Sequence, residues 1–214
     1  MNDPTTLRVG VSALEQEGKA GDNSILARAC VAVREDVYEG YSDNGKLYQA
    51  TNENSAAAGN LVGPTAFANT APILIVRNSK GGSKIVIMDL TLWVASAPNA
   101  ACQVIVALDT VNRYSSGGNL NDAEHWNLNP SGTISPNIEI YEALTGGGAI
   151  VATAAAGREV VAAYHPSAVG TSISLVLPGS IILPSLNHSM LVYAWCGTTG
   201  PSYNYRLTWA ERPV

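Results

Sequence analysis

The sequence is poor in charged side chains and has no long apolar run. Asp, Glu, Lys and Arg make up 14% of the 214 residues, well below the usual quarter. The net charge is −5 and no cluster of Lys or Arg is present, so we expect no direct binding to nucleic-acid phosphates. No apolar run approaches the ~20 residues of a membrane-spanning helix, and we expect no membrane contact. The first residues, Met1–Pro4, also lack the basic and apolar regions of a signal peptide.

Cysteine is scarce, and the three cysteines are widely separated at Cys30, Cys102 and Cys196. No CxxC or His/Cys spacing indicates a zinc site. Cys102 and Cys196 lie within apolar strand patterns, where an unpaired cysteine behaves as a small core residue. A disulfide that joins these two between sheets remains an alternative, because cysteine pairing cannot be deduced from sequence.

No familiar catalytic motif is present. The chain has no GxSxG, GxGxxG, P-loop or HExxH pattern. Its acidic residues could supply a carboxylate pair, but without an expected spacing no pair stands out. We therefore expect a protein that is not an enzyme and uses no cofactor. Two alternatives are a small hydrolase and a calcium site at Asp109 and Asn112, near Asn119 and Asp122, where oxygen-bearing side chains gather.

The strongest pattern in the chain is a series of apolar strands between residues 72 and 109. Pro72–Asn78 is followed by a Ser/Lys/Gly turn, then by the runs Lys84–Val94 and Ala101–Asp109. Each run alternates with a period of two, which is the period of side chains along a β-strand. In the second run the face expected to be apolar carries Val86, Met88, Leu90, Leu92 and Val94, and in the third it carries Cys102, Val104, Val106 and Leu108. The pattern predicts an antiparallel β core.

The second half of the chain adds further strand patterns. Short strands are expected at Ile138–Ala143 and Glu159–Tyr164, and Ser189–Cys196 is apolar enough for a strand buried on both faces. The last strand is expected to place Tyr203, Tyr205, Leu207 and Trp209 on one face. With Gly, Pro and Asn turns and little helical periodicity, these patterns favour an all-β fold, a jelly-roll-like antiparallel β-sandwich.

Residues 1–55 are expected to form an N-terminal extended arm and a β-hairpin, and residues 56–214 to form the sandwich domain. Asn44–Gly45 accepts two successive positive φ angles, so we expect a two-residue hairpin turn between Val37–Tyr41 and Lys46–Ala50. Residues 24–34 could instead form a helix that Ser24 caps. We expect the arm to become ordered against a neighbouring molecule. The alternative is that this segment forms an extra edge strand of the same sheet.

Thr110–Pro136 is expected to be a long functional loop. Its most site-like group is His125 and Trp126, which Asp122 and Glu124 flank. An exposed Trp126 could stack on a sugar or bind a protein, or its ring could fold back as an anchor over the core. The residues that we select as interaction residues, in the arm and in this loop, are Leu7, Val9, Val11, Ile25, Tyr38, Tyr41, His125 and Trp126.

Four stretches of the chain resemble a family of virion structural proteins of tailed bacteriophages. They are Gly45–Asn52, Pro72–Lys84, Ala107–Gly118 and Leu207–Pro213. In that family a linker leads to a strand that ends in Asn, then to a small Gly/Ser turn and a long core strand, and the chain closes on a Trp-x-Glu-x-Pro tail. The resemblance carries no active-site residues over to this chain.

The resemblance implies a virion structural protein, and within that class we expect a capsid decoration or cement protein. A low-charge surface suits that role because neutral side chains cost less to desolvate, and symmetric copies turn weak contacts into avidity. The expected partners are the major capsid protein or other virion proteins and further copies of the chain, with a trimer favoured. The expected location is the virion, after synthesis in the host cytoplasm. Alternatives are a tail, adaptor or fibre component and a carbohydrate-binding β-sandwich module.

Overall fold

The computed structural model describes only part of the chain. The described residues are 40–42, 44–52, 59–96, 102–121, 125–132, 137–146, 148–153, 159–164, 172–175, 181–197 and 200–214. The predictions made for Leu7, Val9, Val11, Ile25 and Tyr38 lie outside these ranges. The chain groups into a larger unit of Tyr48–Trp126 and Ile134–Val214 and a smaller unit that includes residues 40–47 and 127–132.

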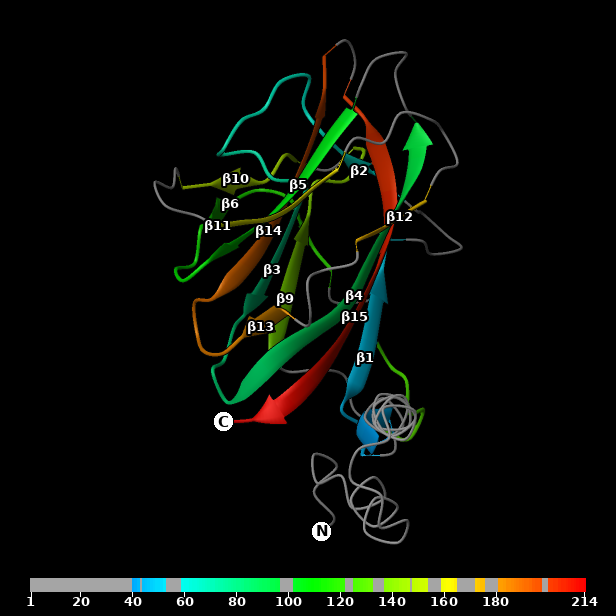
Figure 1. Cartoon of the computed structure of the whole chain (residues 1–214), viewed down its shortest axis with the longest axis vertical. Helices are drawn as coiled ribbons and strands as arrows, with labels where there is room; N and C mark the ends of the chain where they lie inside the picture. Colours follow the sequence, from blue (N-terminus) through cyan, green and yellow to red (C-terminus); the bar gives the residue numbers. More distant parts are fainter. Residues whose placement is uncertain are drawn as a thin grey trace, which may run out of the picture. The chain divides into compact units, whose positions relative to one another are not determined.

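The larger unit is built from two antiparallel sheets, as the strand patterns predict (Figure 1). The first sheet has the order β12-β4-β15-β1-β8, with β13 paired to β4 and β2 paired to β15. Its strands are β1 (Leu47–Thr51), β2 (Leu61–Val62), β4 (Ser83–Ser96), β8 (His125–Asn127), β12 (Ser172–Leu175), β13 (Ile181–Leu183) and β15 (Ser202–Pro213).

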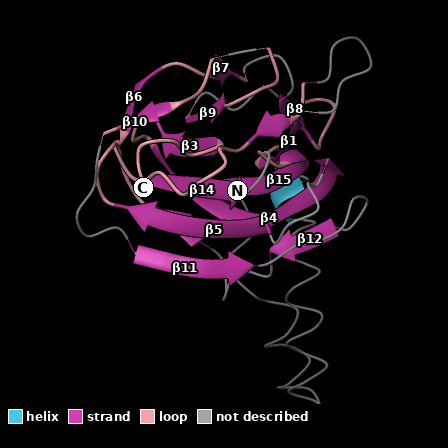
Figure 2. Cartoon of the chain, turned by 90° about the horizontal axis from the view of Figure 1, so that it is seen from above, coloured by secondary structure: helices cyan, strands magenta, loops and turns pink. Residues whose placement is uncertain are grey.

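The second sheet has the order β11-β5-β14-β3-β9-β7, and Figure 2 shows both series of strands from above. Its strands are β3 (Leu74–Asn78), β5 (Cys102–Asp109), β7 (Asn119–Leu120), β9 (Ile138–Glu142), β11 (Glu159–Tyr164) and β14 (Ser189–Cys196). A separate two-stranded ladder joins β6 (Tyr114–Ser116) to β10 (Val151–Ala152). Strands were therefore predicted correctly over most of this unit.

Nine strands of the two sheets form a nested set of neighbours, in which β12 and β13 pair with successive parts of β4. The first of them, β1, lies beside the last, β15. Inside that pair, β3 pairs with β14, β4 with β12 and β13, and β5 with β11. From β1 through β3 and β4 to β5, each strand of the set lies in the other sheet from the one before it, whereas β5 and β11 pair within one sheet.

The inner faces of the two sheets share one hydrophobic core. Strand β15 contributes its alternate residues Tyr203, Tyr205, Leu207 and Trp209, as predicted, and all four are fully buried. Strands β3, β5 and β14 of the facing sheet supply Leu74, Val76, Val104, Val106, Met190, Val192 and Ala194. Burial of an aliphatic side chain of this size contributes roughly 1.5–3 kcal/mol, so this layer is the main source of stability.

The predicted face of β4 is right in its second half and wrong in its first. Leu90, Leu92 and Val94 point into the core, but Ile85 and Ile87 do so in place of Val86 and Met88. The cause is a β-bulge: Thr208 pairs with Asp89 and Trp209 with Ile87, so Met88 has no counterpart on β15. One extra residue shifts the phase of the alternation, and the two halves of β4 keep their apolar side chains inside.

The Asn44–Gly45 sequence does not form the predicted hairpin. Residues 40–42 are helical, and Gly45 has a φ of 61°. The Gly45 N–H donates to the Ser42 carbonyl at 2.9 Å and the Lys46 N–H to the Tyr41 carbonyl at 2.8 Å. This bond pair defines a Schellman cap, in which a residue with positive φ ends a helix. Of the two positive φ angles predicted, Gly45 has one and Asn44 does not, and the element that Gly45 ends is a helical turn.

The predicted 110–136 loop is only partly a loop, because it contains β6, β7 and β8. Asn121, just after β7, is buried and ties this segment to the core. Its amide donates to the Thr51 carbonyl at 3.0 Å and to the Glu142 carboxylate at 2.5 Å. The Tyr205 hydroxyl donates to the same carboxylate.

None of the helical segments in the described ranges has the length and apolar character needed to cross a membrane.

Candidate interaction surface

The outer face of the six-stranded sheet carries the most distinctive side chains of the larger unit. Because inner and outer residues alternate, Ile75, Arg77, Glu139, Tyr141 and Tyr193 lie opposite the core face of their strands. Ile75, Leu191 and Tyr193 form a second hydrophobic cluster here with Ala107, Ala143, Ile150 and Ala152, and Ile105, Tyr114, Tyr141 and Trp195 pack against it half-buried. This face therefore combines apolar, aromatic and polar groups.

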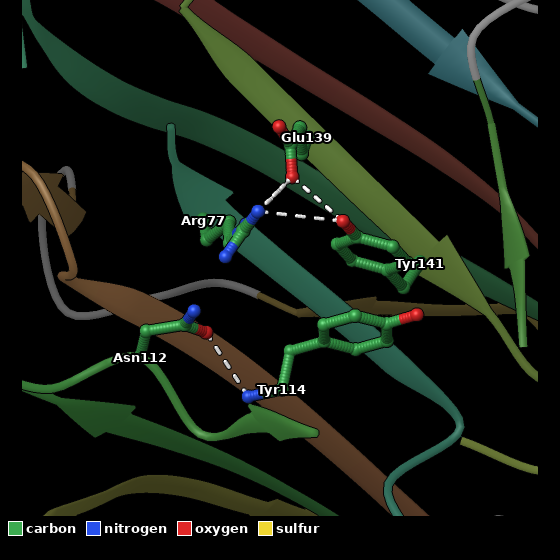
Figure 3. A network of polar contacts seen from close by, with 5 residues as sticks. All are labelled: Arg77, Asn112, Tyr114, Glu139 and Tyr141. Atoms are coloured by element: carbon green, nitrogen blue, oxygen red, sulfur yellow. Dashed lines mark hydrogen bonds and ion pairs between the residues drawn. The ribbon is translucent and has the colours of Figure 1, made fainter. Parts of the chain in front are cut away.

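One end of the face holds a polar cluster of Arg77, Glu139, Tyr141 and Tyr114 (Figure 3). Arg77 and Glu139 are directly opposed on β3 and β9. The Arg77 Nε donates to Glu139 Oε2 at 2.7 Å, and Nη2 contacts the same oxygen. The Tyr141 hydroxyl also donates to Glu139 Oε2, at 2.7 Å. One carboxylate oxygen thus orients both a guanidinium and a phenol.

The aromatic half of the cluster is a stack of two tyrosines. The Tyr114 and Tyr141 rings lie 3.7 Å apart between centroids with planes 16° apart, and Figure 3 shows one ring over the other. The Arg77 Cζ is 5.4 Å from the Tyr141 centroid, within cation–π range. Burial, followed by the hydrogen bond to Glu139, raises the pKa of Tyr141 to about 12, while Arg77 acts to lower it. Tyr141 therefore stays a protonated donor at neutral pH.

A second aromatic group lies on the same face around Phe67. Phe67 is 48% exposed, and its ring centroid lies 5.0 Å from that of Trp195 and 5.6 Å from that of Tyr193, tilted by 58° to each. The Tyr193 hydroxyl donates to the Asn69 carbonyl at 3.1 Å and so holds the loop that carries Phe67. The group offers flat apolar area in fixed positions, which suits contact with a protein or a sugar ring.

An open apolar recess of about 380 Å³ lies where the 62–72 loop meets the residues after β9. Val62, which is 39% exposed, contributes to its wall. The other lining residues are Gly63, Pro64, Ala71, Pro72, Ala143, Leu144, Thr145, Gly146, Gly148 and Ala149. Neither a charged nor an aromatic side chain is among these lining residues, so the recess suits a small apolar group.

A second recess, of about 290 Å³, is more polar and includes Asp109 and His188. The His188 Nδ1 lies 2.9 Å from the Ser185 hydroxyl, a contact that a serine hydrolase would also need. The two residues belong to one turn, in which the His188 N–H donates to the Ser185 carbonyl. The Asp109 carboxylate accepts hydrogen bonds from Arg113 Nε at 2.7 Å and from the Val111 N–H at 3.1 Å.

Asp109 and Asn112, two of the suggested calcium ligands, accept hydrogen bonds from backbone N–H groups two residues further along the chain. Asn112 Oδ1 accepts the Tyr114 N–H at 3.0 Å, and Asp109 binds Arg113. Across the described part of the chain, no three His, Cys, Asp or Glu side chains are grouped as metal ligands. Asp122 lies outside that part.

Of the eight selected interaction residues, three fall among the described residues. Trp126, on β8, is 43% exposed, which is the open arrangement rather than an anchor folded over the core. His125 precedes it on the same strand. Tyr41, in the smaller unit, is only 6% exposed. That these residues contact a partner stays a prediction.

Sequence reasoning missed Phe67, Arg77, Tyr114, Glu139 and Tyr141. The period of two already places Arg77, Glu139 and Tyr141 on the outer side of their strands. It does not reveal that β3 and β9 are neighbours, because Arg77 and Glu139 are 62 positions apart in the chain. Once β3 and β9 are known to pair, the directly opposed Arg77 and Glu139 indicate an ion pair on this face.

No protein-family model, curated protein or solved structure matches the chain.

Proposed function

We propose that this protein is a structural component of a tailed-phage virion, which decorates or cements the capsid by self-association and by an N-terminal arm. The observation that carries the proposal is the nested pairing of β1 with β15, β3 with β14, β4 with β12 and β13, and β5 with β11. A long hairpin wrapped in this way yields two interlocked Greek keys, the arrangement of a jelly roll. Jelly rolls are common in viral capsid domains and also in lectins.

The surface chemistry supports the same proposal. Large apolar side chains that are at least 39% exposed include Val62, Phe67, Val111, Leu120, Trp126, Leu128, Val151, Ile182 and Leu186. With only 14% charged residues in the chain, such a surface loses little hydration energy when it is covered. The Phe67 group is its densest aromatic part, and we infer that it contacts the major capsid protein or another copy of the chain.

Self-association and an arm would act together. Each contact alone can be weak, because several copies on one particle bind with high effective concentration. A closed ring such as a trimer would place identical contacts at a symmetry axis of the capsid. In this role the protein catalyses no reaction and needs no cofactor, and it reaches the virion after synthesis in the host cytoplasm.

The first test is the mass of the purified protein, measured by light scattering behind a sizing column. A trimer or another closed ring supports the proposal. The second test removes residues 1–36 and measures decoration of particles that lack the protein. We expect loss of docking with the β domain still folded by circular dichroism. Full occupancy by the truncated protein would refute the arm, and failure of the full-length chain to bind particles would refute the capsid role.

A carbohydrate-binding module is the second candidate, and the 43% exposure of Trp126 favours it. An open indole can stack on a sugar face, and jelly rolls serve in lectins. We expect Trp126→Ala to abolish binding to a glycan array under this hypothesis while leaving particle decoration unchanged. Leu186→Ala is the matched control and should leave glycan binding unchanged, because Leu186 is a similarly exposed apolar side chain outside the aromatic groups. A tail, adaptor or fibre position would instead appear as binding to tails in electron micrographs of labelled virions.

A further inference from the structure

Cys102 and Cys196 face each other across two neighbouring strands. Cys102 is the first residue of β5, Cys196 is the last residue of β14, and the two are direct partners in the antiparallel register. Both are fully buried thiols on the inner face. The sequence left open whether they are core residues or a disulfide, and they belong to one sheet instead of bridging two.

The direction of the backbone groups shows which kind of cross-strand pair this is. The Cys196 N–H donates to the Pro64 carbonyl at 3.3 Å, away from β5. Four residues earlier on β14, the Val192 carbonyl accepts the Ile73 N–H, from the residue just before β3. Backbone groups of Val192 and Cys196 therefore point to the same side, and Cys102–Cys196 is a pair without mutual backbone hydrogen bonds. In such pairs the Cα atoms are about 4.5 Å apart and the side chains are closest.

That spacing lies within the 4.4–6.8 Å range of Cα separations in disulfides. The two thiols already interact: burial, with hydrogen bonding to Cys196, raises the pKa of Cys102 to about 11, and the neighbouring Tyr203 hydroxyl acts in the opposite direction. We propose that Cys102 and Cys196 are a modification site that is converted to a cross-strand disulfide by a small disulfide oxidant. The bond would fasten the ends of β5 and β14 to each other.

The chemistry is a two-step exchange. The thiolate of one cysteine attacks a sulfur of oxidised glutathione and releases one glutathione thiolate, which takes up a proton. The second cysteine, deprotonated, attacks the protein sulfur of the mixed disulfide and releases the second glutathione. Two protein thiols are oxidised and one glutathione disulfide is reduced to two thiols. Because both cysteines are buried, the exchange requires opening of the strand ends, which are the parts of a sheet that open most readily.

The inference does not depend on the capsid role, although a protein that leaves the reducing cytoplasm in a particle would meet oxidising conditions. The test uses the full chain with Cys30→Ser, so that only two thiols remain. The protein is incubated with oxidised glutathione, both as purified and after unfolding and refolding in that buffer, then alkylated and digested without reductant. We expect a linked Cys102–Cys196 peptide by mass spectrometry and a Tm higher by roughly 5–15 °C.

Cys102→Ala and Cys196→Ala in the same background are the controls. They should show no linked peptide and no rise in Tm on oxidation. The proposal is overturned if the refolded two-thiol protein keeps two alkylated cysteines, or carries only glutathione adducts or links between chains. A linked protein with a lower Tm would also overturn it, because the bond would then strain the native strands.

Discussion

Tyr48 and Trp209 stack inside the core of the larger unit, with ring centroids 5.6 Å apart and planes 17° apart. Trp209 is fully buried and Tyr48 is 1% exposed. The stack joins β1, from the start of the described chain, to β15 at its end, and so closes the outermost pair of the nested strands.

Removal of this indole should be among the most damaging single changes. We expect Trp209→Ala to lower the free energy of unfolding by about 3–5 kcal/mol, because it leaves a large cavity. The matched control is Trp93→Ala on the outer face of the same sheet, where the half-buried indole lies under Arg206. That change should cost about 1 kcal/mol. Urea denaturation followed by circular dichroism measures both, and equal losses would contradict the assigned faces.

Deletion of Met88 should be tolerated. The deletion removes the bulge and leaves Ile87 and Leu90 two positions apart, so both stay inside. On the other edge of β4, β13 ends its pairing at Ile87 and β12 starts its pairing at Leu90, so no ladder partner is lost.

The matched control for that deletion removes Thr91. It turns Leu92 and Val94 outward and should prevent folding. Near-ultraviolet circular dichroism and solubility distinguish the outcomes. Failure of both deletions, with equal loss of structure, would show that the bulge is required for the fold.

Stability should fall in strongly alkaline solution. Burial raises the pKa of Tyr141 and of Tyr48 to about 12, with Glu139 and Glu211 respectively adding to the shift. The unfolded tyrosine has a pKa near 10. A raised folded pKa means that the contribution is complete below about pH 10 and is lost as pH rises from 10 toward 12. Denaturation at several pH values should show a shallower decline in Tyr141→Phe than in the parent.

The same tyrosine reports on its carboxylate partner. Glu139→Gln removes the negative charge that favours the neutral phenol and replaces a carboxylate acceptor by a weaker amide one, so the pKa of Tyr141 should fall. The difference in absorbance at 295 nm between this variant and its Tyr141→Phe derivative isolates the Tyr141 titration. An unchanged midpoint would contradict the assigned hydrogen bond.

Asn78 should be a stability determinant out of proportion to its size. It is buried at the end of β3, and its amide donates to the Ser83 carbonyl at 2.6 Å and to the Leu183 carbonyl at 3.2 Å. We expect Asn78→Ala to cost about 2–4 kcal/mol in thermal or urea unfolding, because buried carbonyls lose their partner. Asn44→Ala removes an exposed hydrogen bond from the Asn44 side-chain amide to the Gly40 carbonyl. This change should lower the free energy of unfolding by under about 0.5 kcal/mol.

The local sequence pattern was sufficient to predict which residues are buried where one face of a strand is apolar over its whole length. The alternation in β15 predicted its core residues correctly, and the uniform apolarity of β14 predicted burial on both faces. The β4 pattern misled in its first half, since a bulge is set by the partner strand and leaves no mark in a run of apolar residues. The Asn44–Gly45 signal indicated positive φ but not which element it would end.

The candidate surface was beyond sequence reasoning for a related reason. Arg77 meets Glu139, and Phe67 meets Trp195, only because strands distant along the chain become neighbours in one sheet.

The sequence by itself determined that the chain is all-β and which residues of most strands are buried, because side-chain period and turn chemistry are properties of neighbouring residues. Tertiary structure decided which strands pair, where β4 is interrupted, and that Cys102 and Cys196 are opposed. Pairing depends on the free energy of bringing distant apolar faces together, which no short stretch of sequence contains.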